Sequence, residues 1–180
     1  MTDRLEVAKT YKLFIGGAFP RSESGRSIPV ADAKGRVLAH ISHASRKDLR
    51  DAVEAARKAQ GKWADATAYN RGQVLYRMAE MLEGKKGEFA GLIGGASGKR
   101  EVGAAIDRLV CFGGWADKYA QVLGCNNPVA GPYYNFTVPE PTGVVGVIAP
   151  DDPALLGLVS LIAPPLCAGN AVVEIGRAHV

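Results

Sequence analysis

Two apolar runs separated by a connection of helical length constrain the fold of this chain more than any other feature. Val144–Ala149 is apolar at almost every position, as expected for a central strand of a parallel sheet whose two faces are covered. Ala171–Val173 begins a second apolar run. Because parallel neighbours require a crossover connection, residues 144–173 predict a strand, a helix and a parallel strand.

The predicted crossover, residues 150–170, has the pattern of a single helix. Its apolar side chains recur at helical spacing and are Leu155, Val159, Ile162 and Leu166. Pro164 and Pro165 lack backbone N–H donors, so we expect them to bend or break this helix. Gly169–Asn170 then ends the helix before the second strand begins.

The N-terminal part of the chain predicts β structure. Tyr11–Ile15 is rich in strand-forming residues, and Gly16–Gly17 follows it as a two-residue hairpin turn would. A second pair of strands is expected at Ser27–Val30 and Val37–Ile41. Turn-forming residues, Asp32-Ala33-Lys34-Gly35, connect this second pair.

The chain then changes to helical periodicity. Ser45 and Asp48 form an N-cap pair for an amphipathic helix that runs from residue 46 to about residue 62. Thr67 is the next cap, and its helix is expected to stop at one of the glycines, Gly84 or Gly87.

Two further helices and a strand are expected before the apolar runs. A short helix is predicted around Glu88–Ile93, and a long one over residues 102–123 that Gly124 ends. Gly113–Gly114 weakens the long helix by roughly 1 kcal/mol per glycine relative to alanine, which close packing of a neighbouring helix would explain. Tyr134–Val138 alternates apolar and polar residues, a pattern that predicts a half-buried strand.

The charge of the chain raises the question of a nucleic-acid partner. The net charge is +4 and the pI is near 9.0. The basic residues are scattered among acidic ones, without a run long enough to follow a phosphate backbone, so we interpret them as an ordinary mixed surface. No apolar run approaches membrane-spanning length, and no secretion signal is visible. We therefore expect neither a nucleic-acid partner nor a membrane.

The cysteines and histidines do not suggest a site. Cys111, Cys125 and Cys167 are far apart and odd in number, which argues against a disulfide framework and favours a reducing cytoplasm. His40 and His43 have no acidic or cysteine partner nearby in the sequence, so we interpret them as surface or hydrogen-bonded side chains. We expect no metal site.

The first apolar strand indicates where a ligand would bind. Open parallel sheets bind ligands at the carboxyl ends of their strands, and the first such end here is residues 148–153. No G-x-G-x-x-G motif follows the strand, so the usual dinucleotide fingerprint is absent. These residues alone leave a nucleotide site open without establishing it.

Several motifs nevertheless match one family at that family's own spacing. They are Pro141–Pro150 (PTGVVGVIAP), Ile162–Pro164 followed by Leu166, Ala168–Val173, Leu13–Gly17, the Ala52–Trp63 helix with Arg71 after it, and Gly114–Lys118. Together they span nearly the whole chain. The sequence resembles the N-terminal part of an NAD(P)-dependent aldehyde dehydrogenase, ending before the segment that carries the catalytic cysteine of the family.

The resemblance implies an α/β fold in which N-terminal β-hairpins and helices precede the first βαβ unit of a Rossmann-like parallel sheet. Residues 1–173 would form an incomplete cofactor-binding domain with oligomerisation strands. The implied activity is oxidation of an aldehyde to a carboxylic acid through a cysteine thiohemiacetal, with hydride transfer to NAD or NADP. The implied partners are the aldehyde and further subunits, either identical copies or a related active subunit.

The resemblance also implies site residues, and one of them departs from the family. Ile148, Ala149, Pro150 and Asp151 would line the cofactor. The Pro-Trp-Asn-Phe-Pro stretch of the family is here Pro-Asp-Asp-Pro-Ala, so Asp152 occupies the position of the asparagine. In the family this asparagine amide donates a hydrogen bond to the oxyanion of the thiohemiacetal, whereas an ionised carboxylate only accepts.

Losing one such donor costs roughly 2.7–4 kcal/mol of transition-state stabilisation. Three interpretations of Asp152 stay open. It is protonated in an apolar site and still donates, or the protein is a weakened or inactive relative, or Asp151 and Asp152 cap the crossover helix. The second and third interpretations are compatible with each other.

The last residues of the chain also depart from the family. The family has a lysine and then Pro-Ser-Glu-like residues here, whereas this chain continues from Glu174 with Ile-Gly-Arg-Ala-His-Val. That hexapeptide is the in-frame translation of a widely used sequencing adaptor. We interpret residues 174–180 as a non-native tail. Codons unlike those of the adaptor would refute this interpretation.

Overall fold

The computed structural model describes residues 7–32 and 34–176 of the chain. The predicted turn residue Ala33 and the last part of the expected tail, residues 177–180, lie outside the described residues. The chain divides into two compact units, Met1–Ala56 and Arg57–Val180.

The first unit contains a three-stranded sheet. Its strands are β1 (Lys9–Tyr11), β2 (Ser27–Ala31) and β3 (Val37–Ser42), in the order β1-β3-β2. β2 and β3 pair antiparallel, which confirms the predicted second pair of strands. β1 begins earlier than the strand predicted at Tyr11–Ile15, and it pairs with β3 in parallel.

The predicted strand shifts because the residues after β1 fold back on themselves. Ile15 and Ala18 exchange two backbone hydrogen bonds of 3.0 and 3.1 Å and form one isolated bridge. Between them Gly16 and Gly17 have φ angles of 59° and 82°, a region that residues with a Cβ rarely adopt. The predicted turn is therefore confirmed, but it closes a narrow hairpin instead of two full strands.

Helix α1 (Arg46–Ala64) begins with the predicted cap. The Asp48 backbone N–H donates to the Ser45 hydroxyl (3.2 Å), and the Ser45 N–H donates to the Asp48 carboxylate (2.8 Å). The same carboxylate accepts from the Ser22 hydroxyl (2.7 Å) and from the Glu23 N–H (3.2 Å). These bonds, with that of Ser22 the largest, lower the pKa of Asp48 from 3.8 to about 2.

We expect acid to weaken the first unit through Asp48. Because the folded pKa lies below the unfolded one, the stabilisation is present above pH 3.8 and is lost as the pH falls towards 2. The loss should be about 1–2 kcal/mol of unfolding free energy. Urea titrations at several pH values should show this step in the wild type and not in Asp48→Asn. Asp51→Asn, at a half-buried neighbour whose carboxylate pairs with Arg50, is the control, and an unchanged step in Asp48→Asn would contradict the assignment.

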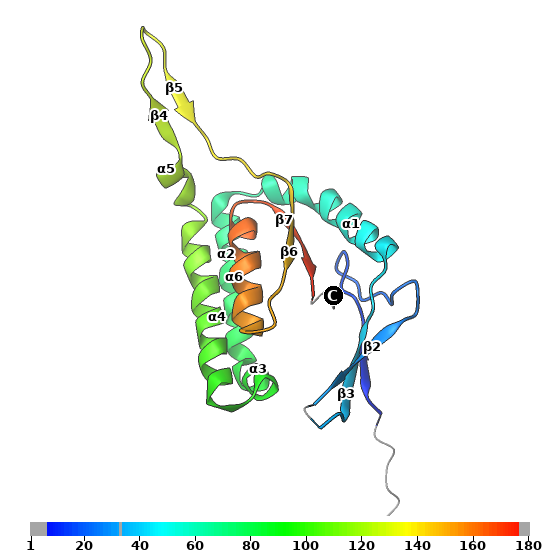
Figure 1. Ribbon diagram of the computed structural model, residues 1–180. Coiled ribbons are helices and arrows are strands. Elements are labelled where there is room, and N and C mark those ends of the chain that lie inside the picture. The colour runs from blue at the N-terminus through cyan, green and yellow to red at the C-terminus, as the bar shows by residue number, and fades with distance from the viewer. Residues whose placement is uncertain (1–6, 33, 177–180) are drawn as a thin grey trace, which may run out of the picture. The chain divides into compact units, whose positions relative to one another are not determined.

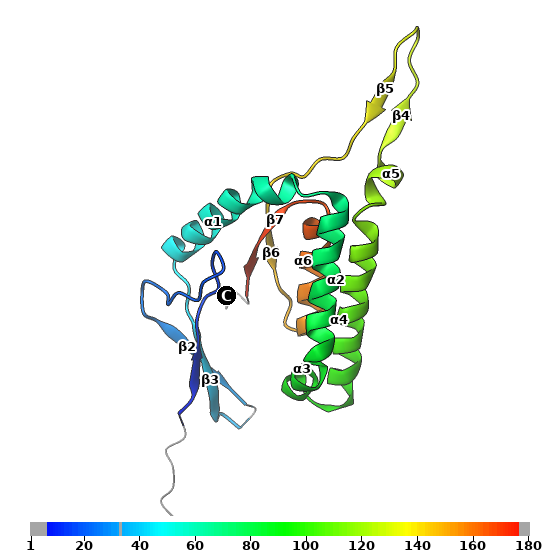
Figure 2. The same cartoon turned by 180° about the vertical axis from the view of Figure 1, so that it is seen from behind.

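In the second unit, the last helix lies between two other long helices and a pair of parallel strands. The helices are α2 (Ala68–Gly84), α3 (Lys86–Ile93), α4 (Gly95–Trp115), α5 (Tyr119–Leu123) and α6 (Ala154–Cys167). The strands are β4 (Cys125–Asn127), β5 (Asn135–Thr137), β6 (Val144–Ile148) and β7 (Ala171–Ile175). α6 contacts α2 and α4 as well as β6 and β7 (Figures 1 and 2). No helix in the described ranges has both the length and the apolar character that crossing a membrane requires.

The helix boundaries confirm most of the predicted ones. The Thr67 hydroxyl accepts from the Asn70 N–H (3.2 Å) as an N-cap, and α2 ends at Gly84. The long helix predicted over residues 102–123 is wrong in extent, because α4 already begins at Gly95 and ends at Trp115, and α5 is separate. Short-range turn bonds, such as the one from Lys118 N to Trp115 O (2.9 Å), replace the helical pattern between α4 and α5.

Close packing between α2 and α4 explains the glycines that lie there. A Cβ on Gly72 would come within 2.8 Å of the Gly113 carbonyl oxygen, and a Cβ on Gly113 would come within 3.1 Å of the Tyr76 ring. The predicted reason for tolerating glycine in the long helix is therefore confirmed at Gly113. Gly103, in contrast, has open space where a Cβ would lie.

This contrast gives a matched pair of substitutions. Gly72→Ala should lower the unfolding free energy by about 1–3 kcal/mol, because the new methyl group forces α2 away from a backbone oxygen of α4. Gly103→Ala should raise it by up to about 1 kcal/mol, because alanine favours the helix and meets nothing. Urea denaturation of both variants and of the wild type measures these changes in unfolding free energy. Equal stabilisation by both would show that the helices are not in close contact at Gly72.

The β4–β5 hairpin corrects the prediction for residues 134–138. β5 pairs antiparallel with β4, a strand that no sequence pattern predicted. All three β5 residues are exposed, so the expected half-buried strand is wrong. The Tyr134 and Phe136 rings lie 5.4 Å apart and contact each other, so here alternation reflects the two faces of a projecting hairpin rather than a core (Figure 1).

The predicted βαβ unit is confirmed. β6 and β7 are parallel and in register from Val144 opposite Ala171 to Ile148 opposite Ile175. The expected break at Pro164–Pro165 is wrong, since α6 continues through both prolines. The lost backbone bonds lie near the end of a helix that the core holds: Ala163 and Cys167 are 0% and 3% exposed.

Candidate functional site

The loop after β6 brings the predicted site residues together at the carboxyl end of the strand. Ala149 N donates to Ile175 O (3.2 Å) and extends the β6–β7 pairing by one bond. Pro150, Asp151 and Asp152 follow on the exposed loop that leads into α6, and Ile148 is 65% exposed. The strand, loop, helix and parallel neighbour required for a ligand site are therefore all present.

Asp152 differs from the capping interpretation. Pro153 is the N-cap residue of α6 and has no side-chain acceptor, and the peptide bond before it is cis. Asp152 is exposed and forms no hydrogen bond or ion pair with any residue in the described ranges. Asp152 therefore does not cap α6. It is also not enclosed in an apolar environment in this chain.

The start of α6 is capped instead by Glu101, which sequence reasoning missed. Its Oε1 accepts from the N–H groups of Leu155 (2.7 Å) and Leu156 (3.2 Å). A carboxylate at this position satisfies free helix donors and complements the positive end of the helix dipole. Glu101 lies on α4, 54 residues before Leu155, so no local sequence signal could have identified this cap.

The end of α6 is held by donors from another part of the unit. Arg71 is 7% exposed, and its guanidinium donates to Cys167 O (3.1 Å) and to Ala66 O (2.5 Å). The Trp63 indole donates to Leu166 O (3.0 Å). A cation at the carboxyl end of a helix is the electrostatic counterpart of Glu101 at its start.

The turn into β7 is tied back to the start of β6 by Asn170. Its Oδ1 accepts from the Thr142 hydroxyl (3.0 Å) and from Gly143 N (2.9 Å), and its Nδ2 donates to Pro165 O (3.3 Å). Asn170 is 6% exposed. Asn170 thus ties the end of α6 to the residues that lead into β6 through part-buried polar contacts.

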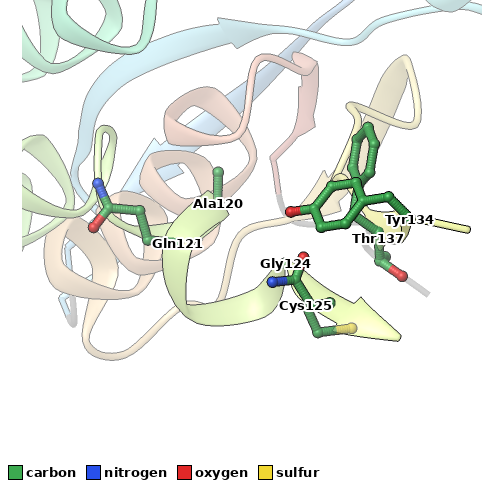
Figure 3. A pocket seen from close by; sticks show the side chains of 8 residues that line it. Ala120, Gln121, Gly124, Cys125, Tyr134 and Thr137 are labelled. Atoms are coloured by element: carbon green, nitrogen blue, oxygen red, sulfur yellow. The ribbon is translucent and has the colours of Figure 1, made fainter. Parts of the chain in front are cut away.

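A cavity of about 500 Å³ lies elsewhere, between α5 and the β4–β5 hairpin (Figure 3). Ala120, Gln121, Gly124 and Asn126 line it together with Cys125, Tyr134, Phe136 and Thr137. It contains none of the predicted site residues and combines no acid with a base. We therefore place the candidate site at the loop after β6 and not in this cavity.

The cysteines do not form a nucleophilic centre. Cys167 is buried, and burial raises the pKa of its thiol, which keeps it protonated. Cys111 and Cys125 are exposed, and the Cys125 thiol donates to the Asn127 side chain (3.2 Å).

Comparison with known proteins relates this geometry to one family. The model described as "Aldehyde dehydrogenase family" matches residues 19–174. Retinal dehydrogenase 2 of Gallus gallus is 38% identical over 183 residues, which cover 96% of this chain and 35% of that protein. Mitochondrial benzaldehyde dehydrogenase of Antirrhinum majus is 35% identical over 172 residues, which cover 90% of this chain and 32% of that protein. The chain thus spans about a third of the length of the curated relatives it matches.

Solved structures share the fold. A salicylaldehyde dehydrogenase from Pseudomonas putida G7 superposes with a TM-score of 0.88 at 25% identity, covering 94% of this chain and 36% of that one. The NAD+ complex of an aldehyde dehydrogenase from Bacillus cereus has a TM-score of 0.85 at 28% identity, covering 92% and 35%. These matches confirm the predicted fold class.

Proposed function

Because the chain belongs to the aldehyde dehydrogenase family, we propose that the longer protein of which it forms part oxidises an aldehyde to a carboxylic acid with NAD or NADP. The observation that carries this proposal is the βαβ unit, whose first strand ends in an exposed loop at the position where open parallel sheets bind ligands. Residues 1–173 would then be an incomplete cofactor-binding domain.

The strand end and the loop after β6 are exposed enough for a cofactor to reach them. A Cβ on Gly146 would meet nothing within 4 Å, and Ile148 at the strand end is 65% exposed, so a ligand has access here. We propose that Ile148, Ala149, Pro150 and Asp151 line the cofactor. When bound, the nicotinamide would accept a hydride from the substrate. The role of this chain is to hold the loop in place through the contacts at both ends of α6.

The nucleophile of the proposed reaction comes from outside these residues. Cys167 is buried at the end of α6, and Cys111 lies exposed on α4. Cys125 belongs to the projecting β4–β5 hairpin. None of the three lies in the loop after β6, so the catalytic cysteine belongs to another part of the longer protein.

The second candidate is a non-catalytic subunit that assembles with an active relative. It is favoured by one observation: Asp152, at the position of the family's oxyanion asparagine, is exposed and forms no hydrogen bond or ion pair with a described residue. Such a group offers no donor to an oxyanion when ionised. In this case the fold would serve to bind other subunits and not to catalyse the reaction.

Both candidates include subunit assembly, and the β4–β5 hairpin supports it. Tyr133, Tyr134 and Phe136 are 76%, 75% and 57% exposed on this hairpin. Clustered exposed aromatic side chains are typical of surfaces that bury themselves against another protein. We propose assembly with identical copies or with a related subunit through these strands.

A cytoplasmic location is the accompanying proposal. It rests on the free cysteines of the described chain, which suit a reducing compartment. Since one relative is described as a mitochondrial benzaldehyde dehydrogenase, fractionation of cells that express the full-length protein is the appropriate check.

Recovery and expression of the full-length gene tests the proposed function. A cysteine in the nucleophile motif of the family, a general-base glutamate and calorimetric binding of NAD or NADP would support the enzyme. Cofactor binding and co-purification with a relative, but without the cysteine, would support the non-catalytic subunit. Failure to bind either dinucleotide would refute the cofactor site.

A further inference from the structure

Two contacts join the loop after β6 and the helix that follows it to other parts of the fold. The first is the cap from Glu101, whose single carboxylate oxygen accepts from Leu155 N and Leu156 N at 2.7 and 3.2 Å. Both donors belong to the first turn of α6, directly after the loop. Because Glu101 is carried by α4, it ties the loop to the helical layer and not merely to its own helix.

The second contact is a fit between Pro150 and Gly157. A Cβ built on Gly157 would overlap Cγ of Pro150 and would lie 3.0 Å from its Cδ. The proline ring therefore occupies the space in which a side chain of α6 would lie. A proline ring cannot turn away as a flexible side chain can, so any larger residue at position 157 has to displace the loop.

We propose that Glu101 and Gly157 are positioning residues that set the conformation of the loop Ala149–Pro153 and, through it, the affinity of the full-length protein for its dinucleotide. This proposal rests on the function proposed above. Glu101 fixes the end of the loop that enters α6, and Gly157 admits the ring of Pro150 near its start. Both residues act through the loop and not by contact with the cofactor.

A purely structural role would predict a different pattern. If Glu101 and Gly157 served only stability, cofactor affinity would change in proportion to the loss of folding stability. A positioning role predicts that cofactor affinity falls without a matching loss of folding stability. The effect should be clearest for Gly157→Ala, because alanine favours the helix while its methyl group moves Pro150. The loop should then shift in a protein whose melting temperature is kept.

The variants for the test are Glu101→Ala, Glu101→Gln and Gly157→Ala in the full-length protein. Asp107→Ala, on the same helix as Glu101 and exposed, controls for the loss of a negative charge. Gly103→Ala, a helix glycine with open space around it, controls for the added methyl group. Calorimetry gives the dissociation constants of NAD and NADP, amide exchange reports on residues 149–156, and thermal melts report on the fold.

Glu101→Ala and Gly157→Ala should weaken dinucleotide binding about tenfold and speed amide exchange in residues 149–156, while both controls match the wild type. Glu101→Gln, which keeps an acceptor oxygen, should recover most of the affinity. If Glu101→Ala does not fold, the dissociation constants of Glu101→Gln and Gly157→Ala test the proposal. Wild-type affinity in Gly157→Ala, or affinity losses that only follow the melting temperature, would overturn the positioning roles alone. A wild type that binds neither dinucleotide would refute the proposed function and this inference with it.

Discussion

Under the proposed function, Asp152→Asn in the full-length protein should raise kcat for aldehyde oxidation by about 10²- to 10³-fold. The substitution replaces a carboxylate, which only accepts hydrogen bonds, with an amide that donates to an oxyanion. One such donor is worth roughly 2.7–4 kcal/mol in the transition state, and removal of the negative charge acts in the same direction. Asp152 has no described partner that the change would disturb, so the folded state should be unaffected.

The control is Asp152→Ala, which removes the same charge at the same position without adding a donor. Steady-state rates at saturating aldehyde and cofactor, measured for both variants and the wild type, separate the added donor from the lost charge. An increase confined to Asp152→Asn supports the donor argument. Equal increases in both variants would assign the effect to charge, and no increase in either would favour the non-catalytic subunit.

The elements predicted correctly from the sequence depend on signals within one turn or one strand. Ser45 and Asp48 lie three residues apart and form the cap that their spacing indicates. The apolar run Val144–Ala149 contains the parallel strand β6 because burial of a strand is visible in its own residues. The assignment of the site to the loop with Asp151 and Asp152 stays a prediction, which rests on that strand and on the general rule for ligands of parallel sheets.

The features that were missed depend on residues far apart in the chain. β4 has only three residues, and its partner β5 lies across a hairpin, so neither has a pattern of its own strong enough to define the pair. The cap from Glu101 reaches α6 only because α4 packs against that helix. Pro164 lies in a helix because the core around Ala163 holds the backbone against a local preference to break.

Arg71 shows how such long-range contacts hold the end of α6. Its donors reach the last carbonyls of α6 at Cys167 and the chain after α1 at Ala64 and Ala66, with distances of 3.1, 3.3 and 2.5 Å. No carboxylate within the described residues pairs with this guanidinium. Backbone carbonyl oxygens therefore accept the hydrogen bonds of this buried cation. The planar guanidinium presents several N–H donors in fixed directions, which the single ammonium group of lysine cannot do.

We expect Arg71→Met to lower the unfolding free energy by about 3 kcal/mol, because charged hydrogen bonds are lost and carbonyl oxygens are left buried without a donor. Arg71→Lys should lose nearly as much, since a single ammonium cannot reach all three carbonyls. Urea denaturation followed by tryptophan fluorescence measures the loss, as Trp63 donates to the neighbouring Leu166 carbonyl. Arg77→Ala, on the exposed face of α2, removes an equal charge and should cost less than about 1 kcal/mol. A small loss in Arg71→Lys would mean that charge alone, and not the fork of donors, holds the end of α6.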